Sequence, residues 1–166
     1  VSSSAPRPKH LAGVRRYPFA GTFEWDGILR AIEDAAAALR PDWVILSAPD
    51  EILHPLTDET LLEAISRLDK EGFNVINFHE FVFLPIDRDY VVGHPGPQPL
   101  QWYYFHQLRP NQQMRARRGS LDVTWRGTGG HGVKGDQVRL ATECFALRHY
   151  IFRSQAMVGE SLAVVV

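Results

Sequence analysis

The sequence lacks the features that mark secreted, membrane-spanning or disulfide-bonded proteins. Its 166 residues include a single cysteine, Cys144, so no disulfide can form within the chain. No apolar run is long enough to cross a bilayer, and residues 1–4 have neither the charged nor the apolar region of a secretory signal. We therefore expect a cytoplasmic protein with no transmembrane segment.

The chain also has almost no net charge, yet its charges are unevenly distributed. The formal net charge is −1. Residues 41–80 contain nine acidic and two basic side chains, whereas residues 100–139 contain seven basic and two acidic ones. This division suits a site that holds a cation with one half and an anion with the other, and it equally suits two solvated faces that attract each other. The acidic half and the small net charge disfavour nucleic acid as a partner, although aromatic residues interleave the basic stretch.

Two helices are predicted in the first half of the chain. Apolar residues at helical spacing predict a helix over 25–39, which Pro41 ends. A second helix is predicted over 57–70, because threonines and acids stand at its start and Gly72 follows its end.

Apolar runs alternate with these helices. The runs 43–48 and 73–86 predict strands that are covered on both faces, as in a parallel sheet. The order helix, strand, helix, strand predicts an α/β fold with a mixed sheet flanked by helices. A helix before a parallel strand also requires an earlier strand. Either residues 14–23 supply a poor strand, or the chain is a fragment or a reduced version of a larger domain.

The second half of the chain is less regular. It contains a loop rich in glycine and proline (93–99), an aromatic stretch (100–108), two possible short strands (121–125 and 142–150) around a glycine-rich turn (127–132), and a possible last helical turn (152–158). We interpret the whole chain as a single domain, with an irregular entry (1–24), an α/β core (25–86) and a C-terminal part (87–166).

The first candidate site follows the strand predicted over 43–48. In open α/β sheets, ligands bind beyond the carboxyl ends of the strands, and Asp50 and Glu51 lie just past such an end. Adjacent carboxylates offer the hard oxygen ligands that Mg²⁺ and Mn²⁺ prefer. The same residues could also form nothing more than a polar turn.

Two further candidate sites carry histidines. In "GTGGHGVKG", residues 127–135, glycines would let the backbone approach a ligand beside His131, with Lys134 near a phosphate, or the stretch could be a simple hairpin turn. In "RHYIFRS", residues 148–154, His149 could be a metal ligand or a core histidine, and Arg153 suits a bidentate contact with phosphate or carboxylate. His79 and Glu80 are a poor pair, because neighbours in a strand point to opposite faces.

These clusters occur in an order that resembles a known family. Its pieces are Asp42-Trp43-Val44-Ile45 leading into Asp50-Glu51-Ile52, the Glu71-Gly72-Phe73-Asn74 turn into residues 78–85, Gly129-Gly130-His131, and His149-Tyr150 with Arg153-Ser154. In this order and spacing, the chain resembles the later part of a family 2 glycosyltransferase with the GT-A fold, over about residues 25–157.

The resemblance implies transfer of a sugar from a nucleotide-diphospho-sugar donor to an acceptor. In this family an aspartate-rich motif at a strand end holds a divalent cation, Mn²⁺ or Mg²⁺, against the diphosphate. Carried over to this chain, the metal ligands would be Asp50, Glu51 and His149.

The resemblance also assigns the remaining roles. The diphosphate would be bound by basic and histidine side chains, for which the candidates are Arg117, Arg118, His131, Lys134 and Arg153. A carboxylate would remove the proton of the acceptor hydroxyl, and Asp122 and Asp136 are candidates by position.

The sequence departs from the family pattern in two places. Ala48 and Pro49 stand where the motif would have its first aspartate and its alanine, so the leading metal carboxylate is absent. The strands that hold the nucleotide base in such enzymes have no clear counterpart before Trp25, so a partner chain or an upstream segment would have to complete the donor site. The alternative hypothesis is a non-catalytic remnant or binding module of the same fold with a degenerate metal site.

Overall fold

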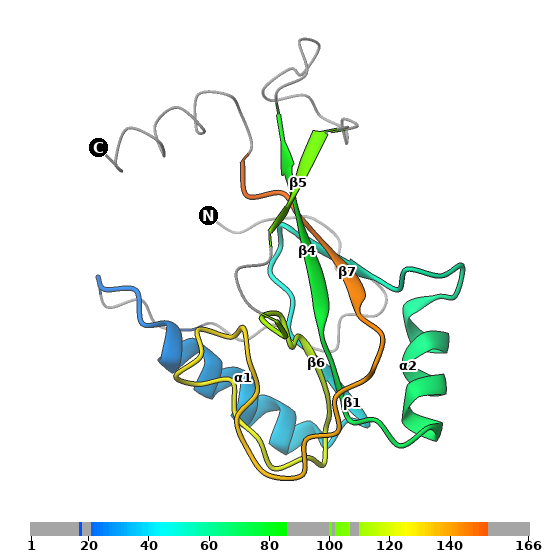
Figure 1. Cartoon of the computed structure of the whole chain (residues 1–166). Coiled ribbons are helices and arrows are strands. Elements are labelled where there is room, and N and C mark those ends of the chain that lie inside the picture. The colour runs from blue at the N-terminus through cyan, green and yellow to red at the C-terminus, as the bar shows by residue number, and fades with distance from the viewer. Residues whose placement is uncertain (1–16, 18–20, 86–99, 101, 107–109, 153–166) are drawn as a thin grey trace, which may run out of the picture.

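The computed structural model describes residues 17, 21–85, 100, 102–106 and 110–152 (Figure 1). In these ranges the chain forms the helices α1 (Trp25–Leu39) and α2 (Leu61–Lys70) and the strands β1 (Trp43–Ile45), β2 (Glu51–His54), β3 (Val75–Ile76), β4 (Phe78–Leu84), β5 (Trp102–His106), β6 (Ala116–Arg118) and β7 (Phe145–His149). The fold is α/β, as the order of sequence patterns predicts.

The strands form two sheets whose order differs from the order along the chain. The first sheet has the order β1-β6-β3, and β6 is antiparallel to both neighbours. The second has the order β2-β7-β4-β5, in which β4 and β7 are parallel and the other pairs are antiparallel. The strands β6 and β7, from beyond residue 100, lie between strands from before residue 86. The parts 25–86 and 87–166 therefore share both sheets.

The expectation of a parallel sheet around residues 43–48 is wrong, because β1 pairs antiparallel with β6. The run is also shorter as a strand than predicted, since β1 ends at Ile45. An apolar run indicates that both faces of a strand are covered, but it carries no information about the direction of the neighbouring strand.

The helix predictions are confirmed, with one shifted start. The helix α1 has the predicted bounds. It is capped by Arg40, whose φ of 49° is left-handed and whose N–H donates to Ala36 O at 2.9 Å. The helix α2 begins after Thr60, which forms a capping box with Glu63. Thr57 instead hydrogen-bonds Glu59 in the preceding turn, at 2.9 Å. No helix in the described ranges is long and apolar enough to span a membrane.

The two helices cover opposite sides of the sheets (Figure 1). The helix α1 packs through Leu29 on a core cluster with Val44, Leu46 and Trp125. The helix α2 packs on a larger cluster formed by Ala64, Ile65, Leu68, Ile76, Phe78, Ala116, Ala141, Phe145 and Leu147. The strand β1 contributes to both cores, because its alternate side chains point to opposite faces: Trp43 packs on the larger cluster and Val44 belongs to the smaller one.

The long strand predicted over 73–86 is divided at Asn77, where the chain passes from the first sheet to the second. The Asn77 side chain is 1% exposed, and its Oδ1 accepts the backbone N–H of Gln113 at 2.9 Å. The backbone oxygen of Asn77 accepts the N–H of Phe145 at 3.0 Å. The same passage occurs between β1 and β2, over residues 46–50. Side chains at the ends of both sheets therefore meet at this junction.

The strand β1 lies at an edge of the first sheet. The N–H of Leu46 donates to Arg115 O at 2.8 Å, and Asp42 O accepts the N–H of Gly119 at 2.7 Å. Because antiparallel pairing uses alternate residues, the backbone groups of Trp43 and Ile45 point away from β6, toward an edge that no strand of the described ranges covers.

Some of the strands predicted in the second half of the chain are present in the structure and others are not. The stretch 100–108 contains β5, and 142–150 contains β7. Residues 121–125 form no strand beyond an isolated bridge between Thr124 and Lys134. The loop 93–99 lies outside the described residues, as do most of the helical turn expected over 152–158 and most of residues 14–23.

Candidate functional site

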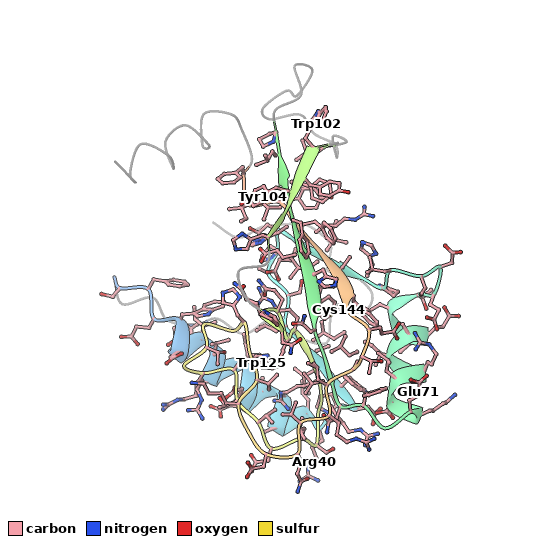
Figure 2. All side chains as sticks on the ribbon, in the orientation of Figure 1. Arg40, Glu71, Trp102, Tyr104, Trp125 and Cys144 are labelled. Atoms are coloured by element: carbon pink, nitrogen blue, oxygen red, sulfur yellow. The ribbon has the colours of Figure 1, made fainter. Side chains whose placement is uncertain are left out.

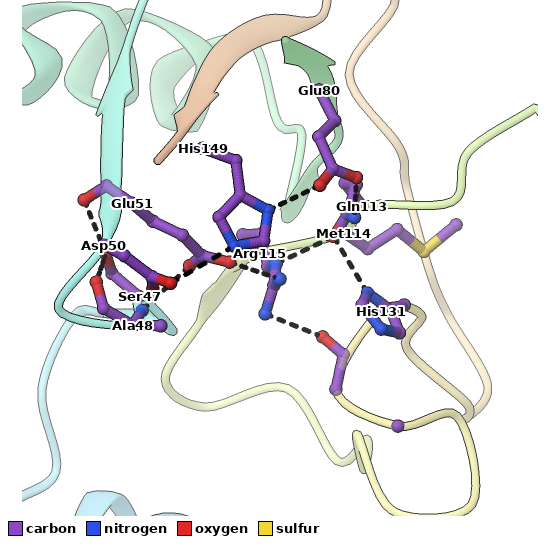
Figure 3. A network of polar contacts seen from close by, with 12 residues as sticks. Ser47, Ala48, Asp50, Glu51, Glu80, Gln113, Met114, Arg115, His131 and His149 are labelled. Atoms are coloured by element: carbon purple, nitrogen blue, oxygen red, sulfur yellow. Dashed lines mark hydrogen bonds and ion pairs between the residues drawn. The ribbon is translucent and has the colours of Figure 1, made fainter. Parts of the chain in front are cut away.

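Polar side chains gather at the junction of the two sheets (Figure 3). We call this group the polar network, and it consists of Asp50, Glu51, Glu80, Gln113, Arg115, His131 and His149. They come from the start of β2, the middle of β4, the segment before β6, the glycine-rich loop and the end of β7. Residues distant in sequence therefore form one site.

A buried ion pair joins Arg115 to Glu51. The Arg115 Nη2 donates to Glu51 Oε1 at 2.6 Å, and the two side chains are 6% and 2% exposed. The other oxygen of Glu51 accepts the backbone N–H of Ala48 at 2.8 Å. The Arg115 Nη1 donates to Gly130 O at 3.5 Å. The pair thus ties the turn after β1 to the glycine-rich loop.

Gln113 connects the two halves of the polar network. Its Oε1 accepts Arg115 Nε at 2.9 Å, and its Nε2 donates to Glu80 Oε2 at 2.5 Å. An arginine can only donate and an ionised carboxylate can only accept, so these partners determine the orientation of the amide. The same Oε1 is 3.1 Å from His131 Nδ1. That nitrogen therefore carries a proton, and the lone pair of neutral His131 lies on Nε2.

His149 lies between two carboxylates. Its Nδ1 donates to Glu80 Oε1 at 2.6 Å, and its Nε2 is 3.7 Å from Asp50 Oδ2. The pairing of β7 with β2 places His149 opposite Glu51, and its pairing with β4 places it opposite Val82. The end of β7 thus delivers the imidazole to the acids of both neighbouring strands.

The two histidines have pKa values shifted in opposite directions. Burial alone would lower the pKa of His149, but the hydrogen bond and charge of Glu80, with the charges of Glu51 and Asp50, raise it above 6.5. Partial burial of its ring and the charge of Arg115 lower the pKa of His131 below 6.5. Near pH 6.5 the polar network therefore favours a charged His149 and a neutral His131.

The pKa of Glu80 shifts in the direction that matches His149. Burial alone would raise this pKa, but hydrogen bonds from His149 and Gln113, with the charge of His149, lower it below 4.5. Burial also lowers the pKa of Arg115, which the charges of Glu51, Glu80 and Asp50 oppose. A guanidinium nevertheless stays protonated in proteins.

These shifts predict a pH window for the stability that His149 contributes. Its raised pKa adds stability that is complete below pH 6.5 and is lost as the pH rises through the folded-state value. The lowered pKa of Glu80 adds stability that is present above pH 4.5 and is lost as the pH falls. We expect the difference in free energy of unfolding between wild type and His149→Gln, measured by urea denaturation, to be largest between these two values.

The matched control is His131→Gln. Because the pKa of His131 is lowered, the stability that its neutral ring contributes is present above pH 6.5 and declines as the pH falls. A His149→Gln difference that stayed constant with pH, or followed the His131→Gln trend, would contradict the assignment.

The structure brings together four of the residues singled out in the sequence. Asp50, Glu51, His131 and His149 come from three separate clusters, and all belong to the polar network. The expectation that His79 and Glu80 point to opposite faces agrees with their contacts. Glu80 joins the network, while the ring of His79 meets Phe105 edge-on.

Two arginines proposed for the diphosphate lie elsewhere. Arg118 is opposite Trp43, at the amino end of β1, and it pairs with Asp69 at 2.6 Å. Arg117 is buried, and its Nη1 donates to the backbone oxygens of Arg118, Gly119 and Leu121. Both arginines therefore contact other parts of the fold, and neither belongs to the polar network.

The remaining predicted residues are also outside the polar network. Lys134 is exposed and donates to Gly127 O at 3.1 Å. Asp122 and Asp136 are exposed residues of the loop between β6 and β7. Arg153 lies outside the described residues.

Sequence reasoning missed Glu80, Gln113 and Arg115. Glu80 is an acid inside an apolar strand, and such a residue is buried only with a partner. That signal could have identified it. Arg115 is one of several arginines in "RARR", and no local pattern distinguishes it from Arg117. Its role depends on the pairing of β6 with β1, which places it at the carboxyl end of β1.

The residues proposed as metal ligands do not fit a divalent cation in this arrangement. Both oxygens of Glu51 already accept hydrogen bonds, and one of them faces the Arg115 guanidinium at 2.6 Å. A cation there would meet a buried positive charge. Within the described ranges, no group of three or more histidine, cysteine, aspartate or glutamate residues is arranged to hold a metal ion.

Comparisons of the chain with protein-family models, curated proteins and solved structures find no match.

Proposed function

We propose that this chain is a glycosyltransferase-like domain of the GT-A type that acts on a nucleotide-diphospho-sugar, and that the polar network is its site. The observation that carries the proposal is the convergence of Asp50, Glu51, His131 and His149. The resemblance connects these residues in sequence, and in the fold they belong to one group joined by hydrogen bonds and ion pairs.

Exposure separates the polar network into groups that could touch a substrate and groups that position them. Glu51, Glu80 and Arg115 are at most 6% exposed, whereas the Asp50 side chain is 29% exposed and His131 is an exposed residue. We propose that Asp50 and His131 contact the substrate. The lone pair on His131 Nε2 and the carboxylate of Asp50 are both able to accept the proton of a hydroxyl. The other residues hold these two in place.

The alternative is a binding module of the same fold without catalysis. It is favoured by the ion pair between Arg115 and Glu51, which occupies a carboxylate that a metal would need. In that case the polar network would be a structural device, and the chain would bind no donor.

The edge strand β1 offers a place where a further strand could complete a donor site. The backbone groups of Trp43 and Ile45 point toward the edge of the first sheet that no described strand covers, where another strand could pair with β1. Beside this edge is a cavity of about 710 Å³ that is lined by Asp42, Trp43, Ile45, Leu61, Leu62, Ile65, Ser66, Asp69 and Lys70. We propose that a partner chain or an upstream segment adds its strand here.

Calorimetric titration with UDP- and GDP-sugars, with and without Mn²⁺, tests the proposed function. We expect heat of binding with at least one donor, and loss of that heat in Asp50→Asn, because this change removes the charge of the most exposed carboxylate of the network. The control is Asp58→Asn, an exposed acid in the turn before α2.

The outcomes of this titration discriminate between the two candidates. Donors at about 1 mM detect binding worth roughly 4 kcal/mol. Absence of heat with every donor at this concentration would overturn the enzyme hypothesis and support the binding module. Equal heat in wild type and Asp50→Asn would show that the donor binds outside the polar network.

A further inference from the structure

The strand β5 exposes an unusual series of aromatic side chains. Trp102, Tyr103, Tyr104 and Phe105 follow one another and are 43–57% exposed (Figure 2). Because side chains alternate along a strand, Trp102 and Tyr104 lie on one face of the sheet, and Tyr103 and Phe105 lie on the other. The two faces have different surroundings.

On one face, the rings have partners within the sheet. Tyr103 lies 5.4 Å from Phe81 and 5.3 Å from Phe83, measured between ring centroids, and Phe105 lies 5.4 Å from Phe81. Phe83 stacks in turn on Tyr150 at 4.8 Å. Contacts with aromatic side chains of β4 on the same face therefore explain the aromatic residues at positions 103 and 105.

The other face connects β5 to the polar network. Strand pairing places Tyr104 opposite Val82 and places Val82 opposite His149, so the three lie in one line across the second sheet. Neighbouring strands are about 4.8 Å apart, so the backbones at Tyr104 and His149 are separated by about 10 Å. His106 is opposite Glu80, and its ring meets that of Tyr104 edge-on at 6.0 Å. Trp102, Tyr104 and His106 thus form a row on the same face as Glu80 and His149.

We propose that Trp102 and Tyr104 form a platform on which sugar rings of a carbohydrate acceptor stack beside the polar network. This inference rests on the proposed function, because it assigns the acceptor of the same site. The chemistry of the row fits a sugar. A pyranose has an apolar C–H face, which an aromatic ring covers, and a rim of hydroxyls, to which Tyr104 Oη, Trp102 Nε1 and the His106 ring can hydrogen-bond.

The spacing of the row favours an oligosaccharide. Residues two apart in a strand are separated by about 7 Å, which leaves room for one sugar ring on each aromatic ring. Continuity with the polar network distinguishes this occupant from an unrelated docking partner, because the row of Trp102 and Tyr104 continues to His106, which lies opposite Glu80 of the network. The exposed row is also narrow, whereas protein interfaces bury broad patches.

Binding of neutral trisaccharides tests the platform without any donor. The probes are cellotriose, maltotriose, mannotriose and chitotriose, observed by saturation-transfer NMR with titration to about 20 mM, a range suited to millimolar dissociation constants. We expect saturable binding of at least one probe. Each of Tyr104→Leu and Trp102→Leu should raise the dissociation constant about fivefold or more. A lost aromatic stack is worth about 1 kcal/mol, which corresponds to a factor of about five.

The matched control is Tyr103→Leu, which makes the same change at the next residue but on the opposite face. It should leave the dissociation constant unchanged, and thermal unfolding of each variant will show that it is folded. The platform would be overturned if no probe binds, or if Tyr103→Leu weakens binding as much as Tyr104→Leu. It would also be overturned if the wild type binds no sugar but sediments with phosphatidylcholine vesicles in a Trp102-dependent manner.

The result is independent of the donor titration. Donor binding without trisaccharide binding would overturn the platform and leave the proposed function standing. Trisaccharide binding without donor binding would support the platform. It would also indicate that the chain is a carbohydrate-binding module and not an enzyme.

Discussion

Replacing Arg115 by methionine should lower the free energy of unfolding by about 3–5 kcal/mol, the cost typical of breaking a buried ion pair from one side. The change leaves the Glu51 carboxylate, 2% exposed, without its counter-charge. It also removes the donors to Gln113 and Gly130. Urea denaturation of wild type and variant at pH 6 measures the effect.

Two matched variants sharpen this measurement. The double variant Arg115→Met/Glu51→Gln removes both charges, so it should lose less stability than Arg115→Met alone. Arg118→Met makes the same change in the same strand, but its pair with Asp69 is 43% and 34% exposed. A surface pair contributes about 1 kcal/mol or less. Similar small losses in Arg115→Met and Arg118→Met would contradict the importance of the buried pair.

Replacing Trp125 by alanine should cost about 3–5 kcal/mol, as for other large core residues. Its side chain is fully buried between α1 and β6, with Nε1 donating to Met114 O at 2.8 Å. The Arg117 guanidinium lies 4.8 Å from the centre of its ring. The backbone oxygen of Trp125 also accepts the hydroxyl of Thr128 at 2.6 Å, at the start of the loop that carries His131.

The control for Trp125 is the same substitution at an exposed position. Trp102 is 57% exposed, so Trp102→Ala should change the free energy of unfolding by about 0.5 kcal/mol or less. Trp125→Phe should lie between the two, because it keeps most of the ring and loses the indole N–H. Equal effects at positions 125 and 102 would show that Trp125 does not hold the core together.

Local signals in the sequence were sufficient for the helices. Apolar spacing and Pro41 determined the bounds of α1, and the capping residues placed α2 to within a few residues. Strands were harder to predict. The run 73–86 contains Asn77, but nothing local shows that this residue carries the chain from one sheet to the other, because its partner Gln113 is 36 residues away.

The candidate site shows the same limit. His131 and His149 could be recognised as candidate ligands. Asp50 and Glu51 were predicted just past the carboxyl end of a strand, but β1 already ends at Ile45, and Glu51 is the first residue of β2. The role of Arg115 could not be predicted, because "RARR" offers several equivalent arginines. Pairing in the sheet buries Arg115 against Glu51 and leaves Arg118 at the opposite end of β1.

The sequence by itself determined the α/β class and the two helices, because both depend on periodicity and on residues close together in the chain. Tertiary structure alone decided which sheet each strand joins and which charges meet. It turned Glu51 toward a guanidinium, where the sequence suggested a metal, because antiparallel pairing of β6 with β1 brings Arg115 to that point. Contacts of this kind join residues 64 positions apart and leave no local pattern to read.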